Sequence, residues 1–557
     1  MFLGTISARA LRRWTGPSDR GLPPAGSAGR RGPLLISLTL LLAAVGSAHA
    51  QTDPGAVLHI ANPGSPASLD PHKITGVWEN RIVGDMLIGL TTEGPDGSVQ
   101  PGAAESFSVS DDGLTYTFRI REHEWSDGRP VTAEDFEYSL KRMLAPETAA
   151  PYADFFFMIE GAEAYTTGGG SAEDVAVEAR DARTLEIRLT RPTAYFPGLL
   201  MHFAAMPVPR HVVEAHGADW TQPEHIVVNG PFIVERRVPN ALVELRRNPR
   251  FFGEVSVARV VHHVQEDRSA AVQRFRAGEM HIVRDFPSGS AERLREQVGE
   301  DVVRTDPYLG LSFIAINHTR EALQDARVRA ALALVLRRDI IAGELLGSGE
   351  QPALSLVPPG TANYGEPARY EWADLSPQRR VEEAQRLMRE AGYGPDRPLE
   401  LELRYPVSEN ARRVAIAAQS MWKAAWVDAE LVTAETAVHY SRLQERDFDL
   451  GYAEWLAVYS DPQTFTLLLE SRTGANNFGA FRDEAYDRAT SLAAETADLE
   501  RRAELLKQAE RIALEQHGLI PVYHHASRNL VAPSVTGWQD NPLDVHRSRY
   551  LGLNLSP

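Results

Sequence analysis

Apolar and polar residues alternate along several short segments of this chain. Between residues 114 and 120, Leu114, Tyr116, Phe118 and Ile120 fall on one face of an extended segment. This period of two is the pattern of a half-buried strand. We predict further strands over 56–61, 184–189, 242–247 and 399–403.

Other segments follow the helical period and carry start and stop residues. Thr132 can cap a helix that carries Phe136 and Leu140. Ser376 followed by Pro377 predicts a helix start, and Gly392 its end. Longer helices are predicted over 410–426 and 498–516, and linkers over 206–209 and 307–310. Strands that alternate with helices predict an α/β fold with mixed sheets.

The first fifty residues differ from the rest of the 557-residue chain. Their six arginines outnumber their one acid, Asp19, and Arg30-Arg31 precedes the apolar run 34–45. The run ends at Ala48-His49-Ala50, so residues 1–50 are predicted to be a cleaved secretion signal. The signal is long, which leaves two alternatives: a misplaced start codon, which we favour, or twin-arginine export.

Charge and cysteine content narrow the functional classes. The chain carries a formal net charge of −17, which disfavours binding to nucleic acid. It contains no cysteine, which excludes disulfides, thiol catalysis and a lipidated cysteine anchor. We therefore expect a protein that diffuses freely in the periplasm. The remainder of the chain, at about 150 residues per domain, has room for about three folded units.

No pattern of residues indicates catalysis. The sequence has no H-E-x-x-H, no G-x-S-x-G and no G-x-x-x-x-G-K-[ST] motif. The histidine clusters at 122–124, 262–263 and 524–525 lack a suitably spaced third metal ligand. We expect no enzyme activity and no cofactor; a carboxylate pair that forms only in the folded chain leaves no pattern in the sequence.

A set of distinctive local sequences occurs in order along the chain: Ser68-Leu69-Asp70-Pro71-His72-Lys73, SVSDDGLTYTFRIR (108–121), WSDGRPVTAEDFEYSLKR (125–142), Asn229-Gly230-Pro231-Phe232, VRAALALVLRRD (328–339), EAQRLMREAGYG (383–394) and Asn541-Pro542-Leu543-Asp544-Val545-His546. This ordered set resembles the oligopeptide-binding family of solute receptors for ABC importers (solute-binding family 5). The resemblance runs from about residue 57 to the C-terminus.

This resemblance implies an α/β fold: a bilobed periplasmic-binding-protein clamshell with mixed sheets and an extra third domain. Domain I would be discontinuous (51–87, 210–309 and 524–557), domain II would span 88–209 and domain III 310–523. The ligand would be enclosed between domains I and III by hinge closure.

The implied function is capture of a peptide or peptide-like ligand in the periplasm and its delivery to the membrane permease subunits of an ABC importer. The implied protein is a monomer that binds no nucleic acid. The alternatives are a secreted hydrolase, or a periplasmic chaperone or sensor with the same clamshell. An enzyme would convert its ligand, whereas a receptor would return it intact.

The implied ligand site departs from the family's pattern. Val458 stands where relatives use an aspartate for the peptide's α-ammonium, and Tyr452 where they use an arginine for the ligand carboxylate. Thr75 replaces a glutamate of the first ligand-facing strand. Val77, Tyr152 and Trp455 match ligand-contacting positions. Aromatic walls would be supplied by Tyr152 and Trp455. Backbone hydrogen bonds would be supplied by Val77 and by the strand around Leu456.

A peptide amino terminus should therefore not bind at Val458, since an unpaired buried charge is costly. Such a ligand would be uncharged at that end, shifted in register, or paired with another carboxylate. Glu454 is the candidate substitute, about 13 Å from Val458 at ~3.3 Å per residue. It stands where relatives usually have glycine, and a solvated glutamate is the competing interpretation.

Arg284 and Asp285 form a second departure from the family. Relatives have neutral tyrosine and asparagine near this wall of domain I. Arg284 could bind a carboxylate with two hydrogen bonds, and Asp285 could bind an amine. A surface ion pair following a strand is equally compatible with the sequence. His524 and His525 could donate hydrogen bonds to a ligand.

Overall fold

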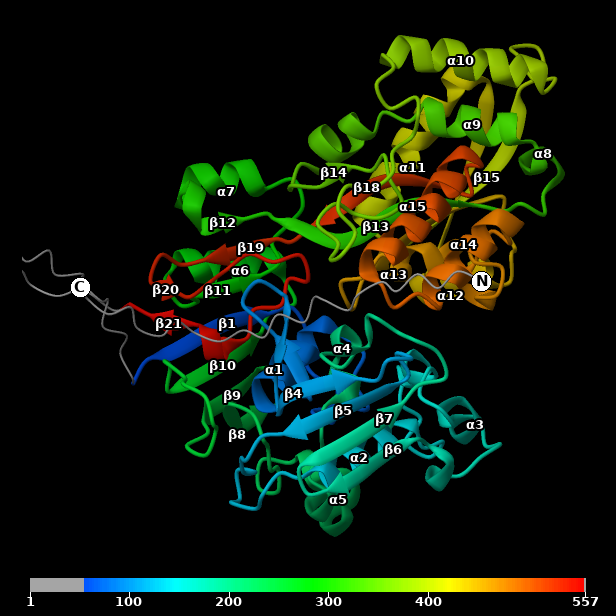
Figure 1. Ribbon diagram of the computed structural model, residues 1–557. Helices are drawn as coiled ribbons and strands as arrows, with labels where there is room; N and C mark the ends of the chain where they lie inside the picture. Colours follow the sequence, from blue (N-terminus) through cyan, green and yellow to red (C-terminus); the bar gives the residue numbers. More distant parts are fainter. Residues whose placement is uncertain (1–54, 555–557) are drawn as a thin grey trace, which may run out of the picture. The chain divides into compact units, whose positions relative to one another are not determined.

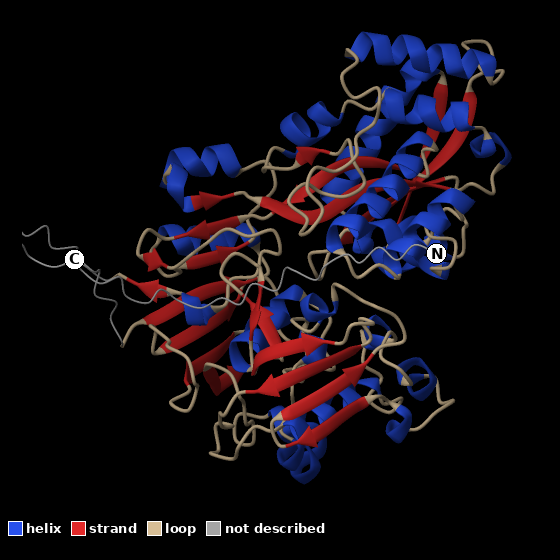
Figure 2. Ribbon diagram, in the orientation of Figure 1, coloured by secondary structure: helices blue, strands red, loops and turns tan. Residues whose placement is uncertain are grey.

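The computed structural model describes residues 55–554, so the predicted signal segment 1–50 lies outside the described residues. The described chain contains three large sheets and two small ones (Figures 1 and 2). The small sheets pair β2 (Thr91–Glu93) with β3 (Val99–Pro101), and β20 (Val535–Thr536) with β21 (Gly552–Leu553).

A seven-stranded mixed sheet combines strands from both ends of the described chain (Figure 1). Strand β1 is parallel to its neighbours β10 and β11, whereas β8, β9 and β19 pair antiparallel. In order, the strands are β12 (Val303–Arg304), β19 (Asn529–Val531), β11 (Ile282–Arg284), β1 (Val57–Asn62), β10 (Arg259–Val264), β9 (Leu242–Arg247) and β8 (Phe232–Val238).

A six-stranded mixed sheet is formed by strands between residues 307 and 526. β15 is parallel to β16 and β17, whereas β13 is antiparallel to β17 and β18. In order, the strands are β14 (Gln351–Pro352), β18 (Leu519–Ala526), β13 (Pro307–Ile316), β17 (Leu450–Leu456), β15 (Leu399–Pro406) and β16 (Val427–Ala434).

The third large sheet is antiparallel and has four strands. It carries the alternating segment predicted first from the sequence, since Tyr116, Phe118 and Ile120 of β5 are buried. In order, the strands are β4 (Ala104–Val109), β5 (Thr115–Ile120), β7 (Thr184–Arg188) and β6 (Val177–Asp181).

Helices cover the sheets, and their starts follow the predicted capping residues. Asp135 accepts a hydrogen bond from the Thr132 backbone N–H at 2.9 Å at the start of α2. Ser376 Oγ accepts one from the Arg379 N–H at 3.3 Å, and Gly392, with φ 88°, follows the end of α10. The α-helices are α1 (Val77–Met86), α2 (Ala133–Leu144), α3 (Ala162–Thr166), α4 (Phe196–Leu199), α5 (Arg210–His216), α6 (Arg268–Arg276), α7 (Ala291–Val298), α8 (Glu321–Gln324), α9 (Ala326–Leu334), α10 (Pro377–Glu390), α11 (Glu409–Trp422), α12 (Thr436–Gln444), α13 (Gln463–Thr466), α14 (Glu484–Ala494) and α15 (Leu499–Glu515).

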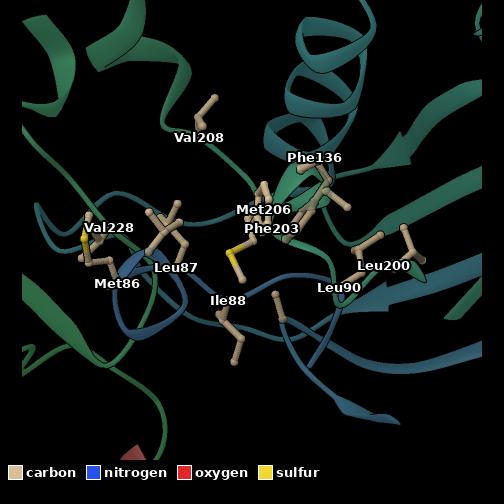
Figure 3. Close-up of a cluster of buried hydrophobic side chains, with 14 of the residues drawn as sticks. Met86, Leu87, Ile88, Leu90, Phe136, Leu200, Phe203, Met206, Val208 and Val228 are labelled. Atoms are coloured by element: carbon tan, nitrogen blue, oxygen red, sulfur yellow. The ribbon is translucent and has the colours of Figure 1, made fainter. Parts of the chain in front are cut away.

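Alternating side chains of the six-stranded sheet belong to two separate hydrophobic clusters. On β13, Ile314 and Ile316 pack with α9 and α11, whereas Leu311 and Phe313 pack with α14 and α15. Helices therefore cover both faces of this sheet (Figure 2). A third cluster joins the seven-stranded and four-stranded sheets, and part of it, including Phe203, is drawn in Figure 3.

Most predicted elements are confirmed, with one clear error among the linkers. The predicted linker 307–310 is wrong, because it forms the first part of β13. Proline is compatible with this position because it is the first residue of the strand. The predicted linker 206–209 lies between elements, as expected.

Candidate ligand-binding site

Two adjoining cavities lie against the end of β17 and the start of α1. We call the larger one, of about 480 Å³, the polar cavity, and the smaller one, of about 270 Å³, the apolar cavity. Both are lined by Val77, Arg81, Tyr308, Leu456 and Asp544. Because they share these residues, a single elongated ligand can occupy both.

Charged side chains dominate the polar cavity. Five acidic and three basic residues line it, so its lining carries an excess of negative charge. Two of these acidic residues, Asp544 and Glu409, pair with Arg284 and Arg413, which lie outside the lining. The charged residues are Arg81, Arg268, Asp285, Glu350, Glu409, Glu454, Arg528 and Asp544.

Hydrophobic side chains line most of the apolar cavity. Of its charged members, Glu93 pairs with Arg547 at 2.6 Å, with both side chains almost fully buried, and Asp544 pairs with Arg81 at 3.2 Å. His202 also lines this cavity, and burial lowers its pKa to about 3, so its ring is neutral. The apolar lining comprises Val77, Tyr152, Met201, Phe203, Leu456, Ala457, Val458, Leu543 and Val545.

The alternation of side chains along β17 decides which of its residues face the cavities. Glu454 and Leu456 line the polar cavity, and Tyr452, on the same face, lies buried behind them. Trp455 points to the opposite face, where it packs against the cluster of α14 and α15 and donates a hydrogen bond to Thr464 Oγ1 at 3.2 Å. Trp455 therefore does not form the expected aromatic wall of either cavity.

Glu454 is held in place by hydroxyl groups from three strands. Its Oε1 accepts hydrogen bonds from Tyr452 Oη at 2.7 Å, Tyr523 Oη at 3.1 Å and Ser312 Oγ at 3.3 Å. These donors belong to β17, β18 and β13. Although the residue is exposed to the cavity, its carboxylate is thus fixed rather than freely solvated.

The groups around Glu454 are neutral hydrogen-bond donors. Burial, together with the charge of Glu454, raises the pKa of Tyr452 and of Tyr523 well above the usual value. Burial lowers the pKa of His525, whose Nε2 lies 3.0 Å from Ser312 Oγ. These groups orient the carboxylate and leave its negative charge uncompensated.

Val77 begins α1 and Thr75 precedes it by two residues, so Thr75 does not lie on the strand that the resemblance implied. Glu79 Oε2 accepts hydrogen bonds from the backbone N–H groups of Thr75 and Gly76 at 3.0 and 2.9 Å. Tyr152 Oη donates to the Thr75 carbonyl at 2.9 Å. Thr75, Val77 and Tyr152 all line the apolar cavity.

Arg284 and Asp285 separate at the end of β11. Asp285 lines the polar cavity and pairs with Arg268 at 2.7 Å and Arg528 at 2.8 Å. Arg284 lies outside the lining of both cavities and pairs with Asp544 at 3.2 Å. Of the two alternatives that the sequence left open, the surface ion pair does not hold for Arg284, since its side chain is only 4% exposed.

Asp544 connects Arg284 to both cavities. Burial alone would raise the pKa of Asp544, but Arg284, His546 and Arg81 hold it well below its usual range. Burial lowers the pKa of Arg284 to about 9, which leaves it charged at neutral pH. Arg284 therefore neutralises a carboxylate of the cavity wall.

Seven of the ten predicted ligand-contacting residues line the cavities, and three do not. Arg284, Tyr452 and Trp455 lie outside the lining; contact of any of the ten with a ligand stays a prediction. Sequence reasoning missed Arg81, Tyr308 and Arg528, because nothing in their local sequence distinguishes them from surface residues. The seven lining residues are Thr75, Val77, Tyr152, Asp285, Glu454, Leu456 and Val458.

Three aliphatic side chains of the lining are unusually exposed. Val77, Leu456 and Val458 are 50%, 43% and 36% exposed. A bound molecule that covers them would remove apolar surface from water, which is favourable.

The two adjacent histidines on β18 diverge, as adjacent strand residues do. His525 lines the polar cavity, whereas His524 is buried, with its Nε2 3.2 Å from the Ser355 carbonyl oxygen. Within residues 55–554, no group of three or more His, Asp or Glu side chains has the arrangement of a metal site. No helix in that same range combines the length and apolar character needed to cross a membrane.

These features define a binding protein with a divided, partly apolar cavity, and comparison with known sequences gives its family. The family described as bacterial extracellular solute-binding proteins, family 5 (middle region) matches residues 98–477. The chain belongs to this family. The predicted family and the α/β clamshell fold class are thereby confirmed.

Particular relatives match almost the whole chain. The periplasmic oligopeptide-binding protein OppA of Salmonella typhimurium is 36% identical over 525 residues, which cover 91% of this chain and 95% of that protein. The periplasmic murein peptide-binding protein MppA of Escherichia coli is 34% identical over 501 residues, covering 88% and 92%.

Solved structures agree with the sequence comparison. The unliganded open form of the murein tripeptide-binding protein MppA superimposes with a TM-score of 0.81, at 33% identity, over 90% of this chain and 98% of that one. The Haemophilus influenzae OppA complex with the peptide RPPGFSPFR gives a TM-score of 0.75, at 31% identity, over 90% and 100%.

Proposed function

We propose that this protein is a periplasmic receptor that binds a peptide or peptide-like ligand in the two cavities and delivers it to the permease subunits of an ABC importer. The pair of adjoining cavities carries the proposal, because exposed Val77, Leu456 and Val458 line it in a chain related to peptide-binding proteins. Ligand release without chemical change is part of the proposal.

We further propose the domain division 51–87, 210–309 and 524–557 (domain I), 88–209 (domain II) and 310–523 (domain III). The sheets support it, since each large sheet draws most of its strands from one of these sets. The cavities lie between residues of domain I, such as Val77, and residues of domain III, such as Leu456. A monomer is proposed, which size-exclusion chromatography with light scattering tests.

The ligand's amino end is expected not to bind at Val458. No carboxylate of β17 lines the apolar cavity, so none is available there to pair with an ammonium group. The buried Glu93 of this cavity is already paired with Arg547. Desolvating an ammonium group without a partner is unfavourable. N-acetylated or otherwise blocked peptides should therefore occupy the apolar cavity better than their free-amino counterparts.

Calorimetry and thermal shift with matched free and N-acetylated tripeptides test this proposal. Saturable binding of short peptides supports a receptor, and mass spectrometry should recover each peptide unchanged. Hydrolysed peptide would indicate an enzyme. Binding of unfolded polypeptides alone, without selectivity among short peptides, would indicate a chaperone.

A further inference from the structure

We infer that Glu454 determines specificity in the polar cavity by binding a positively charged group of the ligand, while the apolar part of the same ligand lies against Val458. This inference rests on the proposed function and deepens it. A cationic group is here a primary ammonium or a guanidinium, carried by a side chain or by a chain end.

The other charges of the polar cavity are already matched within the protein. Asp285 pairs with Arg268 and Arg528, and Asp544 with Arg81. Two further ion pairs join Glu409 to Arg413 at 3.0 Å and Glu350 to Arg528 at 3.8 Å.

Glu454 differs from these carboxylates. Its side chain accepts from three hydroxyls, and its own backbone N–H donates to Tyr440 Oη at 3.3 Å. In the part of the chain that the structure describes, no basic side chain forms an ion pair with it. The hydrogen bonds converge on Oε1, which leaves Oε2 available to a ligand. A carboxylate without a basic partner in a cavity is matched to a ligand cation.

The hydroxyl groups make this carboxylate a preorganised acceptor. Tyr452 Oη and Tyr523 Oη also lie 2.8 Å apart, so these hydroxyls form one hydrogen-bonded network with Glu454 in which the carboxylate can only accept. Because Tyr452, Tyr523 and Ser312 lie on three paired strands, the carboxylate loses little conformational freedom when it binds a ligand. A freely rotating surface glutamate would lack this advantage.

The two cavities therefore select for different parts of one molecule. The polar cavity offers Glu454, and the apolar cavity offers Val458, Leu456 and Tyr152. We expect the preferred ligand to carry its positive group at one end and an uncharged, apolar group at the other.

The test uses N-acetylated tripeptide amides with a single lysine at each of the three positions, and matched peptides with norleucine in its place. Norleucine keeps the aliphatic chain and removes the charge. Wild-type protein should bind at least one lysine peptide about 10- to 100-fold more tightly than its norleucine match, the range expected for a charge-assisted hydrogen bond. Arginine in place of lysine distinguishes guanidinium from ammonium recognition.

The variant Glu454→Gln should abolish this preference and leave norleucine binding unchanged. Glutamine keeps an acceptor oxygen for the three hydroxyls, so the fold is preserved; Glu454→Asp, which restores a charge, should recover part of the preference. Glu484→Gln is the matched control, because it removes one charge from an exposed residue of α14 outside both cavities.

The possible outcomes distinguish failure of the proposed receptor function from failure of the inference about Glu454. Peptides that bind wild-type protein without any preference for lysine or arginine overturn the inference and leave the receptor function standing. A preference that survives in Glu454→Gln also overturns it. If no peptide of either series binds, the proposed function fails and the inference fails with it.

Discussion

The polar and apolar cavities share a wall but differ in how their charges are arranged. The charges of the apolar cavity are matched in two pairs, Glu93 with Arg547 and Asp544 with Arg81, whereas the polar cavity presents Glu454 without a basic partner. A charge matched within the protein supports the fold, and an unmatched one is available for recognition. The same residue types thus serve stability in one cavity and selectivity in the other.

The largest expected effect is a loss of stability when the ion pair of Glu93 and Arg547 is broken. Arg547→Met leaves Glu93 buried without its partner and should lower the free energy of unfolding by about 3–5 kcal/mol. Urea unfolding measures this loss. The exposed ion pairs of Arg386 serve as the control, since Arg386→Met should cost no more than about 1 kcal/mol. Similar losses in the two variants would contradict the comparison.

An effect of intermediate size is expected on the pH dependence of the free energy of unfolding, at the buried residue His524. Burial lowers the pKa of His524 to about 4, so the folded protein keeps it neutral while the unfolded chain takes up a proton below about pH 6.5. Its contribution to stability is therefore lost as pH falls, by about 2 kcal/mol at pH 5.

The variant His524→Gln isolates that contribution, because glutamine can still donate to the Ser355 carbonyl. Urea unfolding between pH 7 and pH 5 should show a shallower loss of stability in the variant than in the wild type. Parallel curves would show that His524 does not take part in the acid response.

A carboxylate introduced into the apolar cavity should give that cavity affinity for a positively charged group, and so tests the difference between the two cavities. Val458→Asp should raise the affinity for free-amino peptides about tenfold or more, because it adds an acceptor for the ammonium group. Calorimetry with free and N-acetylated forms of one peptide measures the change. Val458→Asn, similar in size but neutral, should give much less; an equal gain in both variants would rule out charge as the cause.

The smallest effect is expected from loosening the support of Glu454. Tyr452→Phe removes the hydrogen bond of 2.7 Å to Glu454 and the contacts of the same hydroxyl with Tyr523 and Ser312, whose own hydrogen bonds to Glu454 remain. We expect stability to fall by about 1 kcal/mol and the preference for lysine peptides to weaken. Tyr486→Phe, at a buried tyrosine outside both cavities, controls for loss of a hydroxyl.

Local patterns in the sequence predicted elements better than they predicted the site. The alternation in β5 and the capping residues of α2 and α10 act within a few residues, so they are visible in sequence. Thr75 was expected on a strand because the resemblance conveyed its position but not the nearby helix start that Glu79 stabilises.

The site itself depends on contacts between distant segments. Arg284 pairs with Asp544, and the hydroxyls around Glu454 come from β13 and β18 as well as β17. No spacing within the chain encodes such contacts. Alternation along β17 correctly placed Glu454 and Leu456 on one face, and the same rule would have turned Trp455 away from them.

The connections between the two mixed sheets have a mechanical consequence. Only Thr305 and Asp306 separate β12 from β13, and only Ser527 and Arg528 separate β18 from β19. These links lie side by side, since the Ser527 N–H donates to the Asp306 carbonyl at 2.8 Å. The two links run in opposite chain directions, and Arg528 of one of them also lines the polar cavity. A molecule that touches Arg528 therefore contacts one of the two short segments that join the mixed sheets.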